Sequence, residues 1–161
     1  MKKNLLFILA AGIAILMSSC NFEDGAILVN DTLVVKTDKV EELMSKAWDY
    51  IDVDEYDNAL AYLDSVKNHV KESEIVISKL KNKSAEKFQK FTLEYLAFYD
   101  AAVVDYKQAI KWFQSEDDEL FEKANKLIID FGEKAEEKLD EFVALQAEFA
   151  KANNLELDKS R

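Results

Sequence analysis

The chain contains no proline, and glycine occurs only three times in its 161 residues. Sandwiches and barrels need many tight turns, and such turns depend on proline and glycine. A chain without them is restricted to long, uninterrupted segments joined by few loops, which is the pattern of helical proteins. The composition therefore predicts an all-α fold.

Apolar residues recur at every third or fourth position from residue 40 onward, which is the spacing of one helical face. Four helices are expected, with boundaries at residues that cap helix ends. Asp38 and Glu41 are spaced as a capping pair for the first helix. The other expected boundaries are an end near Asp52, starts at Asp54, Ser73 and Ser115, and an end at Asn153 and Asn154.

The third and fourth expected helices are long. The fourth covers about 38 residues, roughly 57 Å at about 1.5 Å per residue, and the third is similar. The only weak point in the helical pattern of the third helix is Asn82 to Ser84. Helices of this length pack along one another with their apolar faces turned inward. The predicted architecture is an elongated antiparallel bundle of about four helices, two of them long.

The segment 26–35 suits either a helix or a hairpin. Its valines, leucines and isoleucine have high strand propensity on both sides of a turn at Asn30 and Asp31. Val29 and Leu33 nevertheless keep the helical phase of Val40 in the first helix. We favour a helix here, and the hairpin is the alternative.

The first 19 residues have the composition of a signal peptide. Lys2 and Lys3 precede an uncharged, apolar stretch from Leu5 to Met17. This stretch is shorter than the roughly 20 residues that a membrane-spanning helix needs, and no second apolar run of that length follows. We therefore expect a signal that is removed from the mature protein.

The end of this segment, Leu16-Met17-Ser18-Ser19-Cys20, resembles the lipobox of bacterial lipoproteins, where a small residue precedes a cysteine that is diacylated. Met17 departs from the commonest pattern in a way that Bacteroidota-like lipoboxes tolerate. Cys20 is the only cysteine and has no disulfide partner, so acylation would remove an exposed thiol. The resemblance implies attachment to a membrane through lipid on Cys20. The alternative is an ordinary secretory signal with an incidental cysteine.

The resemblance also implies a domain plan and a location. Glu23 and Asp24 lie where Bacteroidota-like lipoproteins carry an acidic signal for export to the cell surface. Asn21 is not the aspartate that retains enterobacteria-like lipoproteins at the inner membrane. We expect an outer-membrane protein, on the periplasmic face or the cell surface. The expected division is a signal peptide (1–19), a lipidated cysteine with its tether (20–25), a helical domain (26–155) and a tail (156–161).

Two short motifs in the mature part resemble uncharacterised helical surface lipoproteins of bacteria. They are Val29-Asn30-Asp31 and Gln146-Ala147-Glu148-Phe149-Ala150-Lys151. The stretches around Tyr56 and Tyr106 resemble the second helix of a tetratricopeptide repeat. Their separation does not match the repeat period of about 34 residues, and its glycine and proline are missing. A scaffold of that kind is retained only as an alternative.

The balance of charge excludes some partners. The chain has 32 acidic and 21 basic residues, for a formal net charge of −11, and removal of Lys2 and Lys3 would make it more acidic. Nucleic acid needs a basic surface and is not expected to bind. With 49% apolar residues, the chain is too hydrophobic for disorder.

No catalytic or metal-binding pattern is complete. His69 is the only histidine, and Val66 stands where a carboxylate-bridged metal site would need glutamate. Asp52, Asp54 and Asp57 lack the glycine and the final glutamate of a calcium loop. With the only cysteine assigned to lipid, we expect no metal, no cofactor and no enzyme.

Four aromatic residues lie off the main apolar faces, and they are the candidates for contact with a partner: Trp48, Tyr62, Phe98 and Trp112. Packing between helices is the simpler alternative for each. The leading hypothesis is a non-enzymatic binding or structural module with a protein partner. The runner-up is a small-ligand or cation-binding protein with a cleft between helices, for which Gln108, Asn125 and Gln146 are candidate polar residues.

Overall fold

The computed structural model describes residues 24–115 and 117–157. These residues form four α-helices and one short 3-10 turn, and they contain no strand. The elements are α2 (Ala26–Asp52), α3 (Tyr56–Ile77), η1 (Lys83–Ala85), α4 (Glu86–Phe113) and α5 (Asp118–Ala152). The prediction of an all-α fold is confirmed. The predicted signal peptide, Cys20 and Glu23 lie outside the described residues.

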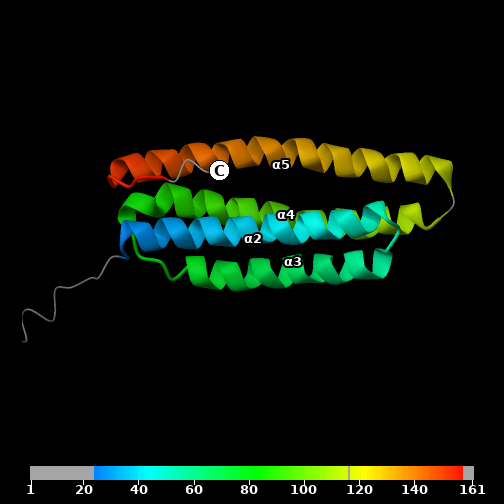
Figure 1. The fold of residues 1–161 in the computed structure, drawn as a ribbon, viewed down its shortest axis with the longest axis horizontal. Coiled ribbons are helices and arrows are strands. Elements are labelled where there is room, and N and C mark those ends of the chain that lie inside the picture. Colours follow the sequence, from blue (N-terminus) through cyan, green and yellow to red (C-terminus); the bar gives the residue numbers. More distant parts are fainter. Residues whose placement is uncertain (1–23, 116, 158–161) are drawn as a thin grey trace, which may run out of the picture.

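The four helices form an elongated antiparallel bundle (Figure 1). Each helix runs opposite to the next, and α2 and α4 lie in the middle with α3 and α5 on either side of them. The longest helix, α5, has 35 residues, and α4 has 28. The predicted architecture is therefore correct, although the third expected helix is shorter than its apolar pattern indicated.

The segment 26–35 is the first part of α2 and not a hairpin. Val29, Leu33 and Val40 are all fully buried on one face of this helix, as their shared phase predicted. Because the helix starts at Ala26, the prediction that Asp38 caps its start is wrong. Asp38 lies in the middle of α2.

The predicted start of a helix at Ser73 is also wrong. Ser73 is buried inside α3, and this helix ends at Ile77. The chain leaves the helical conformation between α3 and α4, close to the predicted weak point at Asn82 to Ser84. There Asn82 has an extended backbone, and its side chain accepts a hydrogen bond from the Ala85 amide. That bond satisfies an amide at the start of the next helical segment, which separates α3 from α4.

Two further caps differ from those expected. Asp117 and not Ser115 caps α5, since its carboxylate accepts hydrogen bonds from the amides of Glu119 (2.9 Å) and Leu120 (3.2 Å). Asp54 has a positive φ of 59° and precedes the N-cap position of α3. Its carboxylate accepts a bond from the Tyr56 hydroxyl (2.6 Å) and does not cap the helix.

Asp24 joins the start of α2 to the loop between α3 and α4. Its amide donates to the Lys81 carbonyl (2.7 Å), and its carboxylate accepts from the Lys81 amide (2.6 Å). The Asn82 side chain donates to the Asp24 carbonyl (2.8 Å). Asp24 is therefore part of the folded domain, whereas the sequence placed it in the tether.

The C-terminal end of α5 turns back on itself at Asn154, whose φ is 54°. The Leu155 amide donates to the Ala150 carbonyl (2.9 Å), which is the bond that closes a Schellman motif. The expected end at Asn153 and Asn154 is thus confirmed. The reversal brings Glu156 and Leu157 beside the space between α2 and α5.

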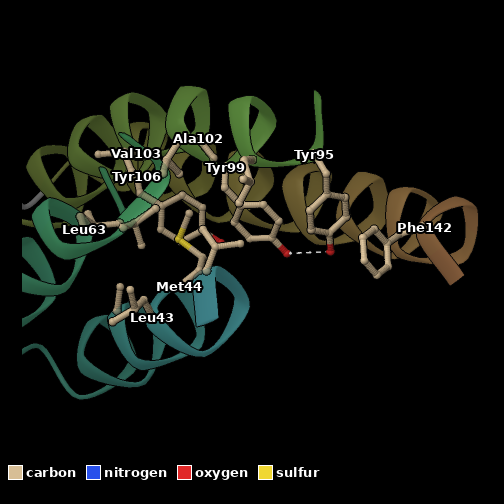
Figure 2. Packing of buried hydrophobic residues seen from close by; sticks show 14 of the residues in the cluster. Leu43, Met44, Leu63, Tyr95, Tyr99, Ala102, Val103, Tyr106 and Phe142 are labelled. Atoms are coloured by element: carbon tan, nitrogen blue, oxygen red, sulfur yellow. Dashed lines mark hydrogen bonds between the residues drawn. The ribbon is translucent and has the colours of Figure 1, made fainter. Parts of the chain in front are cut away.

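The core runs along the inner faces of all four helices. Its centre is a row of tyrosines on α4, which Figure 2 shows packed beside Met44 and Leu43 of α2 and Leu63 of α3. Phe142 of α5 lies against Tyr95, with ring centroids 5.7 Å apart. Within the part of the chain that the structure describes, no helix combines the length and the hydropathy needed to cross a membrane.

Two leucines in α2 provide a matched test of the core. Leu33 is fully buried, whereas Leu28 is 56% exposed. Leu33→Ala should lower the free energy of unfolding by about 2–5 kcal/mol, because it leaves a cavity in the core. Leu28→Ala should change it by less than about 0.5 kcal/mol. Denaturant unfolding of both variants measures the difference, and equal losses would contradict the assignment of faces on α2.

Candidate binding grooves

The four candidate aromatic residues separate into two groups in the structure. Phe98 and Trp112 of α4 line one groove between α4 and α5. Tyr62 of α3 instead stacks on Tyr50 of α2, with ring centroids 5.4 Å apart. Trp48 lies on α2 and is 36% exposed. Two of the four candidates therefore share one groove, and Trp48 and Tyr62 are not in its lining.

The α4–α5 groove has a volume of about 420 Å³. Phe131 of α5 stacks almost parallel to Phe98 with ring centroids 4.9 Å apart, and it makes T-shaped contacts with Tyr99 and Tyr106. Ala101 has a short side chain at the lining, which leaves space above the helix backbone. The apolar members of the lining are Phe98, Ala101, Ala102, Trp112, Leu127 and Phe131.

Lysines form the α5 edge of this groove. Lys123, Lys126 and Lys134 line it, and all three are exposed. Lys138 follows one turn later, with its ammonium 5.5 Å from the centre of the Phe98 ring. The sequence pattern did not single out these lysines, because exposed lysines are common in helices. Their recurrence along one face of α5 is the signal that could have found them.

A second cleft, of about 690 Å³, lies between α2 and α5. Its floor is apolar, with Val34, Phe142 and Val143 among its members. Every ionisable side chain in its lining is an acid, and these acids are Asp31, Asp38, Glu41 and Glu156. The cleft thus differs from the α4–α5 groove in the sign of its charge.

Gln146 is the one polar candidate that lines this cleft. Its amide nitrogen donates to the Asn30 side-chain oxygen at 3.1 Å, and Asn30 donates to Asp31 at 3.2 Å. Gln108 and Asn125 are half-buried and line neither the cleft nor the α4–α5 groove. The link between Gln146 and Asn30 joins the two motifs that resemble helical surface lipoproteins.

Glu41 connects the cleft to the tyrosine row. The Tyr95 hydroxyl donates to Glu41 at 2.6 Å, and the Tyr95 and Tyr99 hydroxyl oxygens lie 3.5 Å apart (Figure 2). Burial raises the pKa of Tyr95 well above its ordinary value, and the bond to Glu41 adds to this effect. Burial also raises the pKa of Tyr99 to about 12. Glu41 therefore satisfies a buried hydroxyl, while the sequence had paired it with Asp38 as a cap.

His69 holds two helices together. Its Nε2 atom is 2.9 Å from the Lys36 carbonyl of α2 and 3.2 Å from the Ser73 hydroxyl of α3. Asp52, Asp54 and Asp57 are exposed. Among residues 24–115 and 117–157, no group of three or more histidine, cysteine or acidic side chains is placed to hold a metal ion.

Comparison of the chain with protein-family models, with curated proteins and with solved structures found no match. Inferences about function therefore depend on the two grooves and on the sequence.

The tyrosines should make stability depend on alkaline pH. Tyr56, Tyr95, Tyr99 and Tyr106 all have raised pKa values, so the folded state holds these protons more tightly than the unfolded state. Their contribution to stability is complete below the ordinary pKa of 10, and it falls as the pH rises toward about 12.

Ultraviolet titration of phenolate checks this expectation. At about pH 11 the folded protein should contain fewer ionised tyrosines than the protein unfolded in guanidinium chloride. In parallel, its melting temperature should fall between pH 10 and pH 12. Identical titration curves for the folded and unfolded protein would contradict the burial of this row.

Proposed function

We propose that this chain is a lipid-anchored envelope protein whose helical bundle binds a protein partner in the α4–α5 groove and catalyses no reaction. The observation that carries the proposal is the position of Phe98 and Trp112. Both were candidates for partner contact, and both line one apolar groove with Phe131. Aromatic side chains in such grooves supply much of the binding energy of protein interfaces.

The lipobox-like residues before Cys20 support the anchor. Asp24 is tied to the end of the bundle by its bonds to Lys81 and Asn82, and only three residues separate it from Cys20. Four chain steps span at most about 14 Å. A lipid on Cys20 would therefore hold this end of the bundle close to the membrane.

The groove would then lie away from the membrane. Its lining begins near the middle of α4 at Phe98 and extends to Trp112, close to the α4–α5 connection. That connection is at the opposite end of the bundle from the start of α2, which Asp24 precedes (Figure 1). We place the anchor in the outer membrane because of the residues after Cys20, with the periplasmic face and the cell surface both retained. Asp24 has a structural role, so Glu23 is the better residue for a test of surface export.

A second candidate function is the binding of a small ligand or cation in the α2–α5 cleft. Gln146 favours it, because this predicted polar residue does line a cleft with an apolar floor. The acids of that lining suit a cationic group. A tetratricopeptide-like scaffold has no such support, because the helices pack as one antiparallel bundle.

Photo-crosslinking in the native envelope tests the proposed function. A photoreactive residue at Ala101, in the α4–α5 groove, should give one discrete crosslinked protein band. The same residue at Ala61, exposed on α3, should give none, since α3 lies across the bundle from α5. Trp112→Ala should reduce the band at least about fivefold, as expected for loss of about 1 kcal/mol or more at an aromatic contact.

Two further arms complete the experiment. A crosslink at Val143, in the α2–α5 cleft, without one at Ala101 would favour the second candidate over the first. Cys20→Ser should release the protein from membranes into the soluble envelope fraction or block its processing. No band at either groove, or a Cys20→Ser protein that is processed normally and still sediments with membranes, would contradict the proposal.

A further inference from the structure

The α4–α5 groove carries a charge opposite to that of the whole molecule. Lys123, Lys126 and Lys134 line it, against two acids, Asp105 and Asp130. The complete chain has a formal net charge of −11. A concentration of lysines beside an apolar lining is therefore a local property of this groove.

The lysines follow the axis of α5. Lys123, Lys126, Lys134 and Lys138 lie on one face of the helix, and Asp130 occupies the same face between Lys126 and Lys134. Lys123 and Lys134 are separated by about 17 Å along the axis, at about 1.5 Å per residue. The apolar lining of α4, from Phe98 to Trp112, runs beside this row.

We propose that the groove binds an acidic amphipathic helix of the partner, an inference that rests on the proposed function. Apolar residues one turn apart on that helix fit against Phe98, Phe131 and Trp112. Acidic residues on its flank face Lys123 and Lys126, which are about one turn apart, and Lys134, which follows about two turns after Lys126. About three helical turns match the length of the row.

Charge explains why this partner is selected. An acidic segment is repelled by much of this acidic surface and attracted at the lysine edge, where an apolar lining lies beside the positive charge. A basic segment has the opposite preference and is drawn to many other places on the molecule. An acidic amphipathic helix is therefore the occupant that matches both the apolar lining and the lysine edge of this groove.

The test uses the purified protein with Trp48→Phe, so that Trp112 in the groove is the only tryptophan. The probes are two amphipathic peptides of about 15 residues, or about 22 Å as helices, with the same leucine stripe and either glutamates or lysines on the flanks. Fluorescence of Trp112 is followed at about 0.15 M salt, where weak nonspecific attraction is screened. The glutamate peptide should shift the emission, and the lysine peptide should leave it unchanged.

Charge reversal makes the test specific to the lysine edge. Lys126→Glu with Lys134→Glu should lower the affinity for the glutamate peptide about tenfold. It should also make the lysine peptide the tighter ligand at Trp112. Lys67→Glu with Lys71→Glu is the matched control. It changes the net charge equally on an exposed face of α3, and it should change either affinity less than about twofold.

The inference is overturned if the two peptides bind equally at Trp112, if reversal at Lys126 and Lys134 does not invert the preference, or if the α3 control pair has the same effect. Failure of the peptides alongside a persistent Ala101 crosslink would reject the acidic helix and leave the proposed function standing. Absence of that crosslink would reject the proposed function itself.

Discussion

Burial of α4 is the constraint on which the rest of the structure depends. This helix contacts α2, α3 and α5, and its tyrosine row occupies the centre of the core. Two of its phenol hydroxyls have partners, since Tyr95 donates to Glu41 and the Tyr95 and Tyr99 oxygens lie 3.5 Å apart. The other helices cover this row. Beside α5 they leave the α4–α5 groove and the α2–α5 cleft.

The chain closes one end of the bundle with polar side chains. Asp24, Asn82 and Asn153 come from three distant parts of the sequence. Asn82 bonds to Asp24, and Ser84 bridges Asn82 to Asn153 with bonds of 2.6 and 3.0 Å. These contacts fix the start of α2 against the end of α5. In the proposed anchored state they would make the bundle a rigid body close to the membrane, with the α4–α5 groove directed away from it.

The fold was predictable because its cause is spread along the whole chain. Every helix lacks proline and has regular apolar spacing, and Val29 and Leu33 keep the same helical spacing as Val40. Helix ends depend on single side chains. Asn82 and Asp117 cap the segments that the sequence pattern predicted to start at Ser73 and Ser115. The site was predictable only in part. Phe98 and Trp112 differ from the core pattern, whereas Gln146 and Asn30 meet across 116 positions and carry no local signal of contact.

The central claim is that the α4–α5 groove is covered by a partner in the envelope. Hydrogen–deuterium exchange of the protein in its native membranes, compared with the purified protein, measures this coverage directly. The account predicts slower exchange in the membranes at residues 98–112 and 123–134, with no change in α3. Equal exchange at both segments in the two samples, or protection confined to α3, would contradict it.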